Sequence, residues 1–201
     1  MTLTKTRTTL AALGVGLTLV LTGCGGGDSD DGSTSSAGSS VDGISAEHND
    51  ADIAFIKDMH PHHEGAIAMA ELAPDKAASA EVKDLATRIA AAQDPEMTLM
   101  ESMAKAWGTE LAAEGGGHGG GHSSGQDGGM EDDAAALGKL SGSAFDKEFL
   151  VRMLAHHEGA LTMSKTELAD GKNEQARKLA TDIIAAQEAE IAEMKALQAK
   201  L

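Results

Sequence analysis

A pair of adjacent histidines, with a methionine three residues before the first of them, occurs twice in this sequence. The two copies of this Met-x-x-His-His motif consist of Met59, His62 and His63, and of Met153, His156 and His157. Residues three apart share one face of a helix, so the thioether and the first imidazole of each motif can approach the same ligand. Thioether sulfur favours Cu(I), and imidazole suits copper generally. The motif therefore predicts a metal site, with copper as the favoured ion.

Two other interpretations of these residues stay open. Di-iron sites in helical bundles use Glu-x-x-His from two helices and one Glu from each of the others. A methionine stands three residues before each histidine here, but Glu96 and Glu190 could complete a mixed site, which makes a ferritin-like di-metal oxidase with iron the enzymatic alternative. In the third interpretation, the protein is a structural or interaction module without metal. Its histidines are then hydrogen-bonded to Gln93, Gln187 or carboxylates.

The two motifs belong to a longer internal repeat. An offset of 94 residues maps one motif onto the other, and the same gap-free offset matches further positions in both halves. Among the matched pairs are Asp52 with Asp146, Phe55 with Phe149, Met69 with Met163, Gln93 with Gln187, Glu96 with Glu190, and Met100 with Met194. A repeat of this extent indicates a duplicated structural unit. We therefore expect one helical hairpin at residues 46–113 and its copy at residues 134–201.

Breaks in the helical pattern divide each half into two helices. Pro74 lies at the break in the first half and Gly171 at the break in the second, and Gly108 ends the helix that runs to Trp107. Short connections make paired helices antiparallel. The predicted fold class is therefore all-α, a four-helix bundle over residues 46–201 with a Gly- and His-rich crossover at residues 114–133.

Two prolines fall inside the expected helices of the first half only. A proline within a helix removes a backbone hydrogen bond and costs roughly 3 kcal/mol. We expect Pro61 to loosen the backbone beside the first histidine pair. At Pro95 we expect a kink or a fresh helix start with Asp94 as the cap.

The N-terminus carries an export signal. Lys5 and Arg7 precede a short apolar stretch that ends at Leu21-Thr22-Gly23-Cys24. The stretch is too short to span a bilayer, and the tetrapeptide resembles the bacterial lipobox, in which the cysteine is lipidated. We therefore predict a lipoprotein signal peptide at residues 1–23, lipidation of Cys24 and a flexible Gly/Ser/Asp tether at residues 24–45. The predicted location is the extracytoplasmic side of the cell membrane, to which the lipid on Cys24 would attach the protein.

Composition excludes some classes of partner and ligand. Without Lys5 and Arg7 the chain has 14 basic and 32 acidic residues, a formal charge of −18, which argues against binding nucleic acid or anionic lipid surfaces. Cys24 is the only cysteine, so metal ligands must come from histidine, methionine or carboxylates. The three phenylalanines, one tryptophan and absence of tyrosine favour closely packed helices over a sheet.

The residues from Met59 to Ala66, followed by Met69-Ala70, resemble the signature of the domain-of-unknown-function 305 family. The second copy, Met153 to Met163, is similar but lacks the proline, and the resemblance extends over residues 48–201. It implies a ferritin-like, commonly exported bundle, in which some members are associated with copper binding and copper tolerance. The metal ligands that it implies are Met59, His62, His63, Met69, Met153, His156, His157 and Met163.

These observations favour a non-enzymatic, lipid-anchored protein that sequesters or hands on copper. No catalytic residue, organic cofactor or protein partner can be named from the sequence. His118 and His122, in the crossover, could capture metal loosely or be ordinary linker residues.

Overall fold

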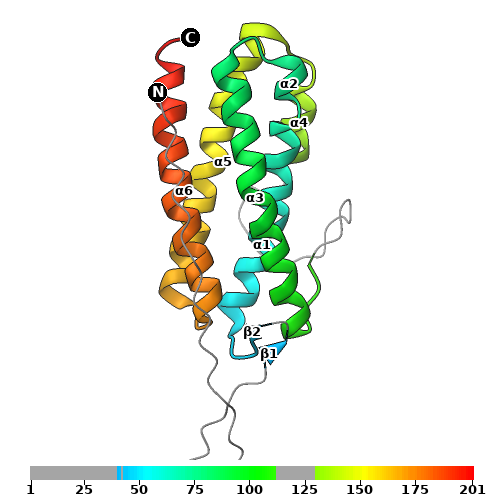
Figure 1. Ribbon diagram of the computed structural model, residues 1–201, viewed down its shortest axis with the longest axis vertical. Helices are drawn as coiled ribbons and strands as arrows, with labels where there is room; N and C mark the ends of the chain where they lie inside the picture. The colour runs from blue at the N-terminus through cyan, green and yellow to red at the C-terminus, as the bar shows by residue number, and fades with distance from the viewer. Residues whose placement is uncertain (1–39, 42, 112–129) are drawn as a thin grey trace, which may run out of the picture. The chain divides into compact units, whose positions relative to one another are not determined.

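The computed structural model describes residues 40, 41, 43–111 and 130–201, and the described part is an all-α fold (Figure 1). Four long helices form the bundle: α1 (Asp50–Ala70), α3 (Ala80–Trp107), α5 (Gly142–Asp170) and α6 (Glu174–Gln198). Two short helices, α2 (Ala73–Lys76) and α4 (Met130–Leu137), accompany them. The predicted all-α class is confirmed. The predicted signal peptide, Cys24, and His118 and His122 of the predicted crossover lie outside the described residues.

Capping residues define where the long helices begin and end. Asn49 caps α1 in a capping box with Asp52, and the side chain of Asn173 caps α6. Gly108 ends α3 in the left-handed conformation (φ 65°), as expected for a glycine at this position. Both α1 and α3 continue through their prolines, so no new helix starts at Pro95. Burial of one face along the whole helix outweighs the single hydrogen bond that a proline removes.

The helices pack as two hairpins joined through their first helices. Helix α1 packs against both α3 and α5, and α5 packs against α6 (Figure 1). The apolar core consists of two clusters. The first apolar cluster includes Met69, Leu85, Ile89, Phe149, Met153 and Met194. The second apolar cluster includes Phe55, Met59, Met100, Met103, Leu179 and Ile183. Residues of one cluster correspond to residues of the other at the 94-residue offset, as Met153 does to Met59. The two halves of the sequence repeat therefore pack with pseudo-twofold symmetry.

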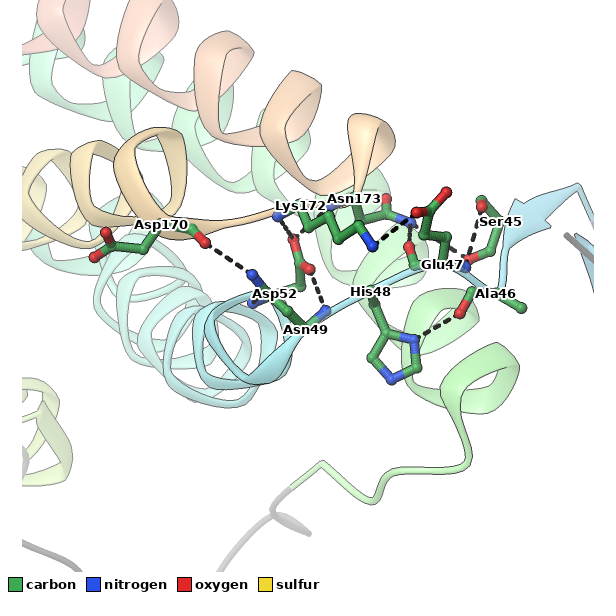
Figure 2. Close-up of polar contacts among 9 residues, drawn as sticks. All are labelled: Ser45, Ala46, Glu47, His48, Asn49, Asp52, Asp170, Lys172 and Asn173. Atoms are coloured by element: carbon green, nitrogen blue, oxygen red, sulfur yellow. Dashed lines mark hydrogen bonds and ion pairs between the residues drawn. The ribbon is translucent and has the colours of Figure 1, made fainter. Parts of the chain in front are cut away.

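Two buried aspartates tie each hairpin to the other. Asp52 in α1 accepts the backbone N–H groups of Lys172 and Asn173, just before α6, at 3.0 and 2.9 Å (Figure 2). Asp146 in α5 accepts those of Ala78 and Ser79, just before α3, both at 3.0 Å. The 94-residue offset relates the two sets of contacts. Each aspartate thus satisfies backbone donors at the start of a helix in the opposite half.

The end of the expected tether is folded rather than flexible. Strands β1 (Ser40–Val41) and β2 (Ile44–Ser45) form a small antiparallel hairpin, and the Ile44 side chain is buried in the second apolar cluster. The Trp107 indole N–H donates to the Ser45 carbonyl at 2.9 Å, while the Gln175 side chain accepts the Ser45 N–H and donates to the Gly43 carbonyl, each at 2.8 Å. These bonds fix the hairpin to α3 and α6. Among the described residues, none of the helices has the length and apolar character required to cross a bilayer.

Candidate metal site

The first histidines of the two motifs meet inside the bundle. Helix α1 presents His62 and α5 presents His156, and the centroids of the two rings lie 3.6 Å apart with the ring planes tilted by 41°. Both residues are buried, at 7% exposure each. His62 and His156 are related by the 94-residue offset, so the pseudo-twofold axis passes through their contact. The structure therefore brings one imidazole from each half to the centre of the fold.

The surroundings keep these two central imidazoles unprotonated at neutral pH. Burial lowers the pKa of His62 to about 3, with further lowering by the neighbouring His63 and His157. Burial also lowers the pKa of His156 well below its usual value; the charges of the three other histidines lower it further, and a hydrogen bond to the His62 backbone opposes them. An unprotonated imidazole has a nitrogen lone pair that can bind a metal ion, whereas an imidazolium has none. At neutral pH, no proton has to leave before His62 or His156 binds a cation.

The second histidine of each motif contacts a glutamate on the neighbouring helix. His63 Nε2 lies 2.6 Å from Glu96 Oε2, and His157 Nε2 lies 2.7 Å from Glu190 Oε2. Both rings are fully buried, and the 94-residue offset relates the two contacts. Each glutamate is thus already engaged by an imidazole.

Several polar atoms beside these histidines have no partner in the protein. They are Nδ1 of His62, His63, His156 and His157, Nε2 of His156, and both side-chain amide atoms of Gln93 and of Gln187. We call the four histidines, the two glutamines, Glu96 and Glu190 the histidine layer. In each long helix, its members fall between residues of the first and second apolar clusters. Buried polar atoms normally have a partner, so a layer with this many open donors and acceptors is typical of a ligand site.

The methionines lie on both sides of the histidine layer rather than within one shell. Met59 packs in the second apolar cluster with Met100 and Met103, whereas Met153 packs in the first with Met69 and Met194. Met163 is half-buried at the edge of the second cluster. The thioethers of the two motifs are therefore separated, with one methionine group adjoining each side of the layer. The predicted metal ligands did not include Met100 and Met194, although the 94-residue repeat matches them to each other.

The donor set of the layer fits a soft, low-coordinate ion better than a hard one. In the described part of the chain, no three His, Cys, Asp or Glu side chains are arranged to hold one metal ion. A cuprous ion accepts two or three soft ligands, and unprotonated imidazoles with adjoining thioethers provide donors of this kind. The open nitrogens of the layer are thus chemically suited to copper.

Two other histidines of the described chain have partners outside this layer. His60 lies 3.5 Å from carboxylate oxygens of both Glu64 and Glu101, with a different ring nitrogen facing each. His48 stacks on Trp107 with the ring centroids 4.8 Å apart, beside the β-hairpin. Neither has a histidine counterpart at the 94-residue offset.

Fold and site together define a duplicated four-helix protein with a buried histidine layer. The sequence profile of the family described as "Domain of unknown function (DUF305)" matches residues 52–198, and the chain belongs to this family. No curated protein shows a significant match.

Solved structures of the same fold agree with this assignment. CopM in the Cu(II)-bound form is 34% identical with a TM-score of 0.62, and the match covers 74% of this chain and 96% of that chain. CopM has also been solved in Cu(I)-bound and Ag-bound forms, at 33% and 31% identity. A presumed secreted DUF305 protein from Streptomyces coelicolor is 27% identical with a TM-score of 0.63, covering 75% of this chain and 93% of that one. A DUF305 fragment from Deinococcus radiodurans, at 24% identity and a TM-score of 0.64, covers 76% and 98% and supports the fold alone.

Proposed function

We propose that this protein binds copper at the histidine layer and sequesters or hands on the ion outside the cytoplasm. The observation that carries the proposal is the contact between His62 and His156. Two buried, unprotonated imidazoles from different halves meet there, and the surrounding protein leaves their nitrogens largely without partners. A cation that these nitrogens bind would satisfy donors that are costly to leave open.

The ligand set favours copper among the candidate ions. Imidazoles of His62 and His156 are the central donors, His63 and His157 are the adjoining ones, and the thioethers are the soft donors on either side. Their methionines are Met59, Met69, Met153 and Met163. Thioether and imidazole together select Cu(I) and accommodate Cu(II). The family relationship supports the same ion, because CopM is a relative with Cu(II)-bound, Cu(I)-bound and Ag-bound structures.

An iron oxidase receives less support from the same geometry. The carboxylates of Glu96 and Glu190 each contact one imidazole nitrogen, so these oxygens are already engaged. The di-iron pattern also needs a carboxylate where this chain has Met59 and Met153. The donor chemistry thus favours binding of copper over oxygen chemistry at iron.

Competition for Cu(I) tests the proposal directly. The whole chain is loaded with Cu(I) without oxygen and then exposed to bicinchoninate, and retained copper is measured by elemental analysis. We expect the wild type to retain copper in a fixed ratio and the His62→Ala/His156→Ala variant to lose it to the competitor. His48→Ala is the matched control, because it removes a histidine outside the layer and should leave retention unchanged. Equal retention by the double variant and the wild type would overturn the proposal.

We also propose that lipid on Cys24 anchors the protein at the extracytoplasmic face of the membrane. The motif Leu21-Thr22-Gly23-Cys24 supports this location. Cell fractionation of the wild type and of Cys24→Ser checks it. The wild type should sediment with membranes, and the variant should not carry the lipid. A wild type found entirely in the soluble fraction would contradict the anchor.

A further inference from the structure

We propose that Glu96 and Glu190 are positioning residues that set the tautomer of His63 and His157. Each carboxylate would hold its imidazole with the proton on Nε2 and leave Nδ1 as a buried lone pair in the histidine layer. The inference that these lone pairs serve copper rests on the proposed function, whereas the tautomer itself does not. The two residues would thus convert His63 and His157 into Nδ1 donors.

Hydrogen-bonding chemistry determines the direction of the two contacts. A carboxylate oxygen can only accept, so the nitrogen that contacts it must carry the hydrogen. The distances of 2.6 Å for His63 and 2.7 Å for His157 are those of strong, charge-assisted hydrogen bonds. Nε2 is therefore the protonated nitrogen in both rings.

The other ring nitrogen follows from its surroundings. Nδ1 of His63 and of His157 is buried and has no partner in the protein. A hydrogen on Nδ1 would be a buried donor without an acceptor, which is costly. The tautomer with hydrogen on Nε2 alone avoids that cost, and it leaves a lone pair on Nδ1. Both halves of the protein show this arrangement, at positions related by the 94-residue offset. Chance packing at a single site does not explain an arrangement that occurs twice.

This arrangement is the one found around metal-binding histidines. Such a histidine commonly donates its second ring N–H to a carboxylate, which fixes the ring and makes the ligating nitrogen more basic. The ligand class that suits a fixed imidazole lone pair in each half of the layer is a soft late-transition-metal cation. Glu96 and Glu190 would act on such an ion through the imidazoles, without touching it.

Nuclear magnetic resonance of the metal-free protein reads the tautomer without reference to copper. Long-range ¹H–¹⁵N spectra distinguish a protonated ring nitrogen from one that carries a lone pair. We expect His63 and His157 of the wild type to be protonated on Nε2 only. In Glu96→Leu/Glu190→Leu the two rings should become mixtures of tautomers. Glu96→Gln/Glu190→Gln should largely retain the wild-type tautomer, because the amide oxygen still accepts.

Copper affinity is the second readout. Loss of an outer carboxylate partner typically lowers metal affinity by about 10–100-fold. We expect a loss of this size for the leucine pair, with partial rescue by the glutamine pair. Glu101→Leu is the matched control, because this glutamate is also on α3 but faces His60 outside the layer.

The two readouts separate the two proposals. A wild type with the expected tautomer but no copper binding would refute the proposed function and leave the positioning role standing. A wild type with Nδ1 protonated, or with mixed tautomers, would overturn the positioning role even if copper binds. Unchanged tautomers in the leucine pair would also overturn it. If the leucine pair does not fold, the wild-type spectrum and the single Glu96→Gln variant still decide.

Discussion

The carboxylate of Asp52 accepts the backbone N–H of Asn173, 121 residues later in the chain, at 2.9 Å. The carboxylate of Asp146, in the second half, accepts the backbone N–H of Ser79, in the first half. Both carboxylates are almost fully buried. These two residues occupy equivalent positions in the two copies of the repeat, and each joins one hairpin to the other by hydrogen bonds.

Replacement of either aspartate by asparagine should destabilise the bundle. The amide retains one acceptor but loses the charge, and hydrogen bonds to charged groups contribute about 1.5–3 kcal/mol. We expect Asp52→Asn and Asp146→Asn each to lower the unfolding free energy by roughly that amount in urea denaturation. Asp182→Asn, at an exposed pair with Lys178, should change it by less than about 1 kcal/mol. Equal effects at all three positions would contradict the interpretation.

Glu167 should make stability fall as pH rises. Its side chain is 1% exposed, and burial raises its pKa to about 8, with further raising by Asp52 and an opposing effect of Arg177. Between the usual value of 4.5 and about 8, the folded state keeps a proton that the unfolded state has released. The unfolding free energy therefore declines as pH rises from 4.5 to about 8. Below pH 4.5 the contribution of Glu167 to stability is fully present.

Urea denaturation from pH 4 to pH 9 of the wild type and of Glu167→Gln measures this contribution. As pH rises, the unfolding free energy of the variant relative to the wild type should increase by a few kcal/mol. Glu188→Gln, at an exposed position, should follow the wild type. Parallel curves for the wild type and Glu167→Gln would exclude the effect.

Gly159 provides space for His62. A Cβ atom at this position would lie 3.1 Å from His62 Nε2, closer than almost all ordinary contacts. Gly159→Ala should gain about 1 kcal/mol of helix propensity, which offsets much of the crowding, while it displaces the imidazole. We expect weaker Cu(I) retention with little change in unfolding temperature. Gly138→Ala, where the added atom would meet the Ala134 carbonyl at 3.4 Å, should retain copper normally.

Gln175 should control whether the β-hairpin stays attached. Its side chain accepts the backbone N–H of Ser45 and donates to the backbone carbonyl of Gly43. In Gln175→Ala, hydrogen exchange at the Ser45 amide should accelerate while exchange in α1 and α5 is unchanged. Gln198→Ala, near the far end of α6, is the control. Unchanged protection of Ser45 in Gln175→Ala would show that the hydrogen bonds from Trp107 and Asn173 and the packing of Ile44 are sufficient.

The sequence predicted the fold well because duplication constrains it twice. The 94-residue offset and the helical period of apolar residues predicted the hairpins, and the buried stripe containing Met59 and His62 is confirmed. The β-hairpin could not be predicted, since its short strands depend on contacts with Trp107 and Gln175 that lie far away in the sequence. The continuous helix through Pro95 also depends on tertiary packing, which local rules do not include.

The candidate site was only partly predictable from the sequence. Helical spacing places His62 and Met59 on one face, but it does not give the axial register between α1 and α5. That register decides that His62 meets His156 rather than a thioether from the opposite half. The engagement of Glu96 by His63 likewise requires the relative position of α1 and α3. The residue types were therefore identifiable, whereas their pairing was not.

The reciprocal contacts of the two halves have a consequence for how such a protein could arise. In an assembly with twofold symmetry, residue i of one copy meets residue j of the other, and j meets i. The Asp52 and Asp146 bonds follow this rule, and His62 meets His156 across the axis. The bundle thus has the architecture of a homodimer whose two subunits have become a single polypeptide. Fusion allows the two histidine environments to diverge, as they have around His60, while the central contact is kept.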